Sequence, residues 1–140
     1  NSSQFNFSQN DLDYIAANYI HLDHDQLITA SAGISYTLRS ESGHATRFSV
    51  DGLLQSGLRA TPGNIPNGQS LPLHTVVNLS VVQKINLGLG RGTELRLDVL
   101  NAGDSVYQIR TGTGTGTGIG VGAPQFGLRR TVLAGITQRF

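Results

Sequence analysis

Hydrophobic and polar residues alternate along five stretches of this chain, and alternation with a period of two predicts β-strands. The stretches cover residues 26–39, 47–59, 73–85, 94–99 and 131–140. Most of them are ten residues or longer, whereas strands of soluble proteins usually have about 5–6 residues. A tilted strand that crosses a bilayer needs about 9–11. We therefore predict an all-β fold, an antiparallel meander of five long strands.

The charged side chains of these stretches all occupy the polar face of the predicted strands. They are Arg39, Arg47, Asp51, Arg59, Lys84, Glu94, Arg96, Asp98 and Arg139. The opposite face carries apolar side chains, namely Ile28, Ile34, Tyr36, Leu38, Phe48, Val50, Leu54, Leu79, Val81, Leu95, Leu97 and Val99. In a transmembrane barrel the charged set faces the lumen and the apolar set faces lipid, because a lipid-exposed Arg or Lys near the bilayer centre costs about 2–4 kcal/mol. A soluble β-sandwich alternates in the same way around its core, so alternation by itself fits both architectures.

The composition excludes several other classes of protein. Only 14% of the 140 residues are charged, well below the usual quarter, which suits strands with one lipid-facing side. The absence of Cys excludes disulfide scaffolds and thiolate zinc sites, and a net charge of +1 leaves no electrostatic footprint for nucleic acid. No apolar run is long enough to predict a transmembrane helix. The first residues carry no secretory signal, so we expect either a cytoplasmic protein or one whose start has been removed.

The connections between the predicted strands alternate in length. Residues 40–44 and 87–92 form short connections, whereas residues 60–72 and 102–128 form long ones. Outer-membrane barrels have short periplasmic turns and long extracellular loops. If the last strand ends in the periplasm, both long connections are extracellular, and residues 1–25 form a further extracellular loop. Within that loop we expect a short helix near residues 10–16, capped by Asn10 or Asp11.

The last stretch resembles the C-terminal strand of Gram-negative outer-membrane proteins. In such strands apolar residues alternate and the final residue is an aromatic, nearly always Phe, which the barrel-assembly machinery reads. The resemblance gives the role of outer-membrane assembly signal to Phe140 together with Ile136, Ala134 and Val132.

A series of blocks along the whole chain resembles, in order, the last part of a TonB-dependent receptor. These blocks are residues 19–26, 57–59, 66–68, 76–79, 98–101, 106–110 and 120–127. The alternating Thr-Gly tract at residues 111–118 looks longer than the corresponding loop of that family. The resemblance implies a 22-stranded barrel with an N-terminal plug, which binds a siderophore-type or other large scarce nutrient outside the cell and takes it up with energy relayed from the inner membrane.

Five strands cannot close a barrel, since known single-chain bacterial barrels start at eight. We therefore expect residues 26–140 to be the C-terminal part of a receptor barrel in the Gram-negative outer membrane. Its partners are then the membrane lipid, the plug and upstream strands of the receptor, the barrel-assembly machinery and, through the full receptor, the inner-membrane energising complex. Nucleic acid is not an expected partner, and neither a cofactor nor an enzymatic activity is expected. A small self-contained outer-membrane barrel and a soluble β-sandwich binding module remain as alternatives.

Three other groups of residues contain types that occur in functional sites. His21, Asp23, His24 and Asp25 include metal-ligand types, but we favour a solvated loop end that leads into a strand. His44 and His74 are expected to be a turn residue and a lumen-facing side chain. The glycine-rich residues 112–122 resemble a nucleotide-binding loop, but such loops need a helix directly after them, and here Pro124 and another strand follow.

The carboxylates of the polar face are expected to be structural. On neighbouring strands, carboxylates and Arg usually pair across the sheet, and Arg47 and Asp51, with Arg96 and Asp98, suit that role. No nucleophile accompanies Asp51, Glu94 and Asp98 to suggest acid–base catalysis.

The assembly role of Phe140 can be tested by Phe140→Ala in the parent barrel. We expect less folded protein in the outer membrane, because the terminal aromatic is the feature that the assembly machinery reads, while ligand binding by the protein that does assemble is unchanged. Quantitative immunoblotting of outer-membrane fractions measures this. A normal outer-membrane level of the variant would show that the assignment is wrong.

Overall fold

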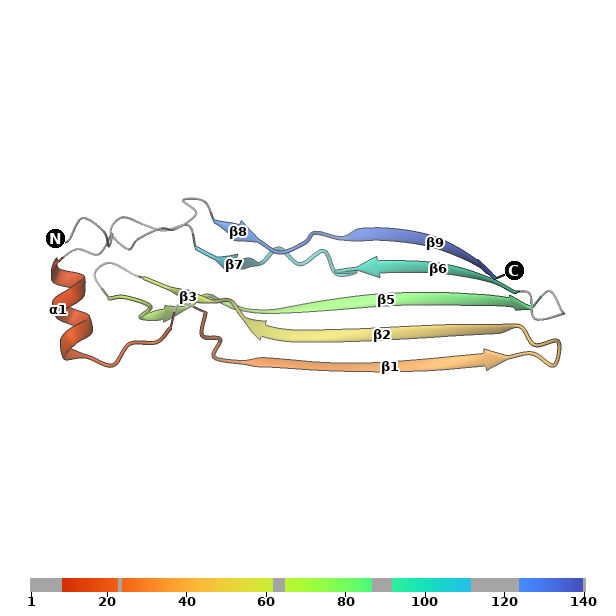
Figure 1. The fold of residues 1–140 in the computed structure, drawn as a ribbon, viewed down its shortest axis with the longest axis horizontal. Helices are drawn as coiled ribbons and strands as arrows, with labels where there is room; N and C mark the ends of the chain where they lie inside the picture. The colour runs from red at the N-terminus through yellow and green to blue at the C-terminus, as the bar shows by residue number, and fades with distance from the viewer. Residues whose placement is uncertain (1–8, 23, 62–64, 87–91, 112–123, 140) are drawn as a thin grey trace. The chain divides into compact units, whose positions relative to one another are not determined.

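The computed structural model describes residues 9–22, 24–61, 65–86, 92–111 and 124–139. Phe140, Asp23 and most of the Thr-Gly tract, which figure in the expectations above, lie outside these residues. The elements in chain order are α1 (Gln9–Ala17), β1 (Thr29–Arg39), β2 (Ala45–Ser56), β3 (Arg59–Ala60), β4 (Gln69–Ser70), β5 (Leu73–Asn86), β6 (Gly92–Leu100), β7 (Gln108–Arg110), β8 (Gln125–Phe126) and β9 (Thr131–Arg139) (Figure 1).

The chain forms two units. The sheet unit comprises residues 30–53, 75–105 and 128–140, and the loop unit comprises residues 1–29, 54–74 and 106–127. The sheet unit holds nearly all of a five-stranded antiparallel sheet with the order β1-β2-β5-β6-β9. The all-β antiparallel meander is therefore confirmed, and each alternating stretch supplies one strand. The loop unit holds α1 and two small sheets, β3–β4 and β7–β8.

Strand register places the apolar residues of β5, β6 and β9 on a single face. Leu79 pairs with Val99 and Val99 with Val132, while Val81 pairs with Leu97 and Leu97 with Ala134. Opposed residues of neighbouring strands point to the same side of a sheet. We call the side that carries these residues the apolar face and the other side the polar face.

The hairpin between β1 and β2 extends the two faces. Ser40 N donates to His44 O at 2.9 Å in the turn, and Gly43 takes a φ of +80°, which favours glycine because it has no Cβ. Gly33 and Asp51 meet on the polar face, since a Cβ at Gly33 would lie 2.4 Å from an Asp51 carboxylate oxygen. His44 lies at this turn and its Nδ1 accepts from Asn86 N at 3.0 Å, so one short turn is hydrogen-bonded to the strand end beside it.

Two boundaries lie three residues inside those that alternation predicts. β1 begins at Thr29, so Ile28 precedes the strand, and β2 ends at Ser56, so Arg59 belongs to β3. Hydrogen bonds of Ser56, which is 4% exposed, explain both boundaries. Its Oγ accepts from Leu27 N at 3.0 Å and its N donates to Ile28 O at 2.9 Å. These bonds close the hairpin, and the chain then turns away from β1.

The helix expected in the first 25 residues is present as α1, but its predicted cap is wrong. Because α1 begins at Gln9, Asn10 and Asp11 lie inside its first turn rather than before it. An N-cap residue must precede the helical backbone, and several adjacent polar residues made the start ambiguous. At the other end, Asn18 Nδ2 donates to Tyr14 O at 2.9 Å. None of the helices in the described part of the chain is long and apolar enough to cross a membrane.

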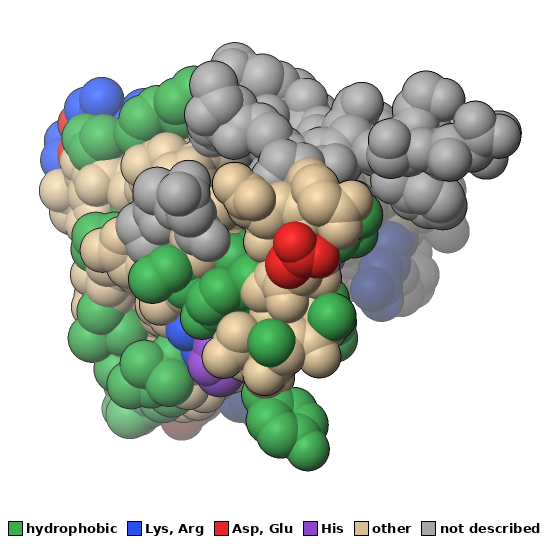
Figure 2. Space-filling model, turned by 90° about the vertical axis from the view of Figure 1, so that its left-hand side faces the viewer, with side chains coloured by type: hydrophobic (Ala, Val, Ile, Leu, Met, Phe, Trp, Pro, Cys, Tyr) green, Lys and Arg blue, Asp and Glu red, His purple; other side chains and the backbone are tan. Residues whose placement is uncertain are grey.

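Few described hydrophobic side chains are buried. The buried set is Leu71, Val76 and Val82, and every residue of β1 is exposed on both faces. Hydrophobic side chains are visible at the molecular surface in Figure 2, where they are green. Among the described residues of the main sheet, the buried hydrophobic side chains are Val76 and Val82 of β5.

Candidate functional site

The apolar face gathers exposed hydrophobic side chains from all five strands of the main sheet. Ten of its side chains are at least 40% exposed, and Ile34 and Ile136 exceed 70%. The ten are Ile34, Tyr36, Leu38, Phe48, Val50, Leu79, Leu95, Leu97, Val132 and Ile136. Ala134 is exposed as well, whereas Leu54, Val81 and Val99 are half-buried, and Ile28, before β1, is 45% exposed. An apolar surface of this extent on a soluble monomer is rare and marks an interaction site.

The apolar face gives way to polar pairs near the short connections. Thr46 Oγ1 donates to Gln83 Oε1 at 2.5 Å, and Thr93 Oγ1 donates to Gln138 Oε1 at 2.5 Å. Thr93 and Gln138 are direct partners in the register, two positions along from Leu95 and Ile136. Side-chain polar groups on this face thus bond to each other at its end, leaving the centre of the face apolar.

Charges on the polar face pair differently from the prediction. Lys84 Nζ lies 3.6 Å from Glu94 Oε2, and the two residues are direct cross-strand partners. Arg96 Nε lies 2.7 Å from Asp98 Oδ2, but both belong to β6, so the expected cross-strand role of this pair is wrong. Residues two apart on a strand share a face and can reach each other.

Arg47 and Asp51, both described, form no ion pair with Arg96 or Asp98, because β5 lies between β2 and β6 in the sheet, so the expected cross-strand role is wrong for them as well. They lie on the same strand, β2, and four residues of extended chain separate them by about 13 Å. Asp51 instead lies over Gly33. Arg39 and Arg139 are exposed strand-end residues, and exposed charges of this kind contribute little to stability.

Arg59 has a different environment from the other charged residues expected to face a lumen. On β3, its side chain is only 8% exposed and its Nη2 lies 3.3 Å from Asp25 Oδ2. The same carboxylate oxygen lies 3.0 Å from His21 Nδ1. Arg110 Nη2 donates to His24 Nε2 at 3.1 Å. Three of the four residues considered as metal ligands are thus engaged in pairs with other side chains, and no group of three or more His, Asp or Glu suited to a metal ion occurs in the residues that the structure describes.

A clamp after β6, formed by Asn101, Asp104 and Arg129, was not anticipated from the sequence. Asn101 is 2% exposed and takes a positive φ of 48°. Its Nδ2 donates to Ser105 O and to Leu128 O, both at 2.9 Å, and its Oδ1 accepts from Ser105 N at 3.0 Å. One side chain therefore joins the end of β6 to the residues that lead into β9.

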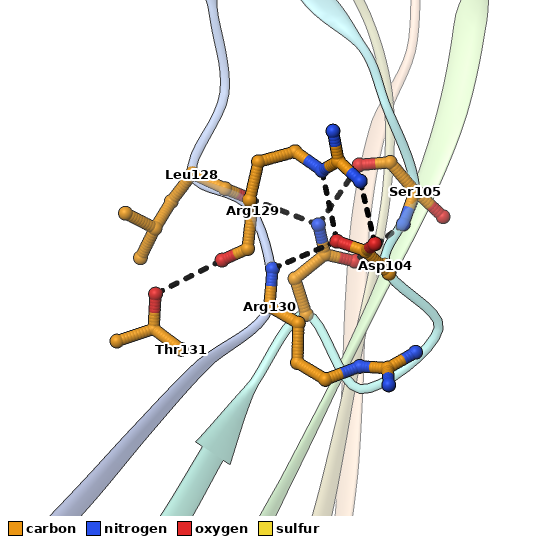
Figure 3. Close-up of polar contacts among 7 residues, drawn as sticks. Asp104, Ser105, Leu128, Arg129, Arg130 and Thr131 are labelled. Atoms are coloured by element: carbon orange, nitrogen blue, oxygen red, sulfur yellow. Dashed lines mark hydrogen bonds and ion pairs between the residues drawn. The ribbon is translucent and has the colours of Figure 1, made fainter.

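Asp104 makes the second connection of this clamp. As Figure 3 shows, its carboxylate lies between the Arg129 side chain and the backbone of Arg130. Arg129 Nε donates to Oδ1 at 2.8 Å and Nη2 to Oδ2 at 2.5 Å, and Arg130 N donates to Oδ1 at 3.0 Å. The Arg129 hydrogen bonds, followed by the Arg130 backbone bond, hold the pKa of Asp104 well below its ordinary value. The Asn-Ala-Gly-Asp sequence is a turn signal, but its partners lie more than twenty residues further along the chain.

No protein-family model, curated protein or solved structure matches this chain. Its function therefore has to be inferred from the chemistry of the two faces and of the clamp.

Substitution of Asn101 should destabilise the protein by removing buried hydrogen bonds. Asn101→Ala leaves the carbonyls of Ser105 and Leu128 without this donor, and we expect a loss of about 3 kcal/mol in the free energy of unfolding. Asn101→Gly is the matched control for the positive φ, and it should be less damaging by about 1 kcal/mol. Denaturant unfolding of the purified protein measures both. Wild-type stability of Asn101→Gly would show that the side-chain bonds contribute nothing.

Acid should weaken the clamp at Asp104. Because the pKa of this carboxyl is lower in the folded than in the unfolded protein, its contribution to stability is complete above about pH 4 and is lost as the pH falls below that value. Asp104→Asn should therefore be less stable than the wild type at neutral pH, with the difference shrinking in acid. Unfolding midpoints at about pH 7 and pH 3 test this, and a difference that does not change with pH would contradict it.

Proposed function

We propose that the chain is the C-terminal part of the β-barrel of a TonB-dependent outer-membrane receptor, which takes up a siderophore-type or other large scarce nutrient. The observation that carries the proposal is the register of β5, β6 and β9, which gathers exposed apolar side chains on one face and charges on the other. In a barrel wall the apolar face meets lipid and the polar face lines the lumen. The proposal assigns the chain no catalytic activity.

Strand length supports a membrane location. The five strands of the main sheet have 9 to 14 residues, and a tilted transmembrane strand needs about 9–11. A soluble sandwich would need a second sheet to cover the apolar face, and the described residues supply none. Both small sheets lie in the loop unit and have strands of only two or three residues.

Aromatic residues and connections provide further support. Tyr36 and Phe48 occupy the apolar face, each four residues from the Ser40–His44 turn, and aromatic girdles lie at both membrane interfaces of outer-membrane barrels. The short turn then faces the periplasm, and the connections that contain β3–β4 and β7–β8 face outward. Within the described part of the chain, the edge strands β1 and β9 are each paired on one side only, and in lipid their free backbone groups must be satisfied by further strands. In the proposal these come from the rest of the receptor.

The assignment of the two faces is tested by introducing Arg at adjacent positions of β1. Ile34→Arg places a charge on the apolar face, where the native side chain is 75% exposed, and should destabilise the assembled barrel by about 2–4 kcal/mol. Ser35→Arg is the matched control, because Ser35 points to the polar face and is also exposed. The folded fraction in outer-membrane preparations, read from heat-dependent migration of the parent receptor, measures both variants.

Equal tolerance of the two Arg variants would contradict the proposal. The soluble alternative predicts a further difference, since a β-sandwich should be monomeric in buffer without detergent. A monodisperse, folded protein under those conditions would favour the sandwich, whereas a requirement for detergent or lipid agrees with the barrel.

A further inference from the structure

Within the loop unit, residues 106–110 form a segment that crosses to β3, and we call it the strap. Leu58 N, just before β3, donates to Ile109 O in the strap at 3.0 Å. Leu58 O accepts from Leu71 N at 3.1 Å. Leu58 therefore bonds on one side to the chain that leads into β5 and on the other to the strap.

Within the same unit, an aromatic contact joins the strap to His74. The ring of Tyr107 stacks on the ring of His74, with centroids 4.0 Å apart and an interplanar angle of 14°. His74 is in the second position of β5, and it shares the face of Ser80 and Lys84 because side chains alternate along a strand. His74 Nε2 also lies 3.0 Å from Gln55 Nε2.

Two glycines allow the strap to approach this closely. A Cβ at Gly57 would lie 2.8 Å from Gln108 O in the strap. A Cβ at Gly127 would lie 1.9 Å from the Tyr107 ring, and Gly127 N donates to Tyr107 O at 2.9 Å. A side chain at Gly57 has to displace Leu71 as well as the strap, and one at Gly127 has to displace the ring of Tyr107.

Among the described residues, the strap is held by the aromatic stack, the Leu58–Ile109 bond, the bond from Gly127 N to Tyr107 O, the short β7–β8 ladder and the hydrogen bond from Arg110 to His24. One feature opposes these contacts. Against them, His74 Nδ1 is buried without a hydrogen-bond partner among the described residues, and burial of an unpaired polar atom is unfavourable. Elements with few stabilising contacts open locally, ahead of the rest of a protein.

We propose that Tyr107 and His74 form a latch that holds the strap against Leu58 and His74 within the loop unit, and that the latch opens independently of the sheet. Opening relieves the unpaired Nδ1 and exposes His74. If the proposed function holds, the strap belongs to the extracellular connection between β6 and β9, on the side from which the nutrient arrives.

Hydrogen exchange followed by mass spectrometry of the purified parent protein tests the latch. Tyr107→Ala removes the stack and Gly127→Ala forces the ring away, so both should raise the exchange rate of the Leu58 amide at least about tenfold. Tyr107→Phe keeps the stack, and Gly135→Ala adds a Cβ that meets nothing within 4 Å, so both should exchange like the wild type. Amides of β6, which is paired on both sides, should keep their rate in all four variants.

Unchanged exchange at Leu58 in Tyr107→Ala and Gly127→Ala would overturn the proposal. An equal rise in the exchange of β6 would overturn it too, because the strap would then not open on its own.

Modification by diethyl pyrocarbonate gives a second measurement. The rate of modification of His74 should rise at least about fivefold in Tyr107→Ala, while that of His44 stays constant. Equal rates at His74 in the variant and the wild type would also overturn the proposal. Neither measurement depends on a membrane location of the protein. Equal tolerance of the two Arg variants of β1 would therefore contradict the proposed function but not the latch.

Discussion

The antiparallel register of β5, β6 and β9 is the constraint on which the rest of the structure depends. Through pairs such as Leu79 with Val99 and Val99 with Val132, it joins the apolar pattern of three separate stretches into one surface. A shift of one residue in any strand would move its apolar side chains to the polar face and its charges to the apolar face. The long strands are thus confined to one pairing by the chemical difference between the two faces.

Beyond the ends of the strands, a small number of polar groups keep that pairing in place. β6 and β9 are separated by a connection of thirty residues, and closing such a loop costs conformational entropy. Asn101 and Asp104 shorten the effective loop by bonding directly to Leu128 and Arg129. The strap belongs to the same connection, and the stack of Tyr107 on His74 holds it in place. The same connection is therefore anchored both at the strand ends and within the loop unit.

Sequence reasoning succeeded where a pattern was long and local. The five strands of the main sheet were predicted because each is long enough for alternation to be visible, whereas β3, β4, β7 and β8, with two or three residues, show no period. Extension of the second strand to Arg59 was wrong because side-chain and backbone bonds of Ser56 end β2 first. Arg96 and Asp98 were predicted to interact across the sheet but pair along one strand.

By itself, the sequence determined which stretches are strands and which side chains share a face, because alternation follows from the two-residue period of an extended backbone. Only the tertiary structure decided the register between neighbouring strands, that Lys84 meets Glu94, that Asp104 holds Arg129, and that Tyr107 lies on His74. Each of these contacts joins residues far apart in the chain or across a turn. Their partners are selected by how the connections pack and not by any local period, and for that reason the clamp and the strap had no signal in the alternating pattern.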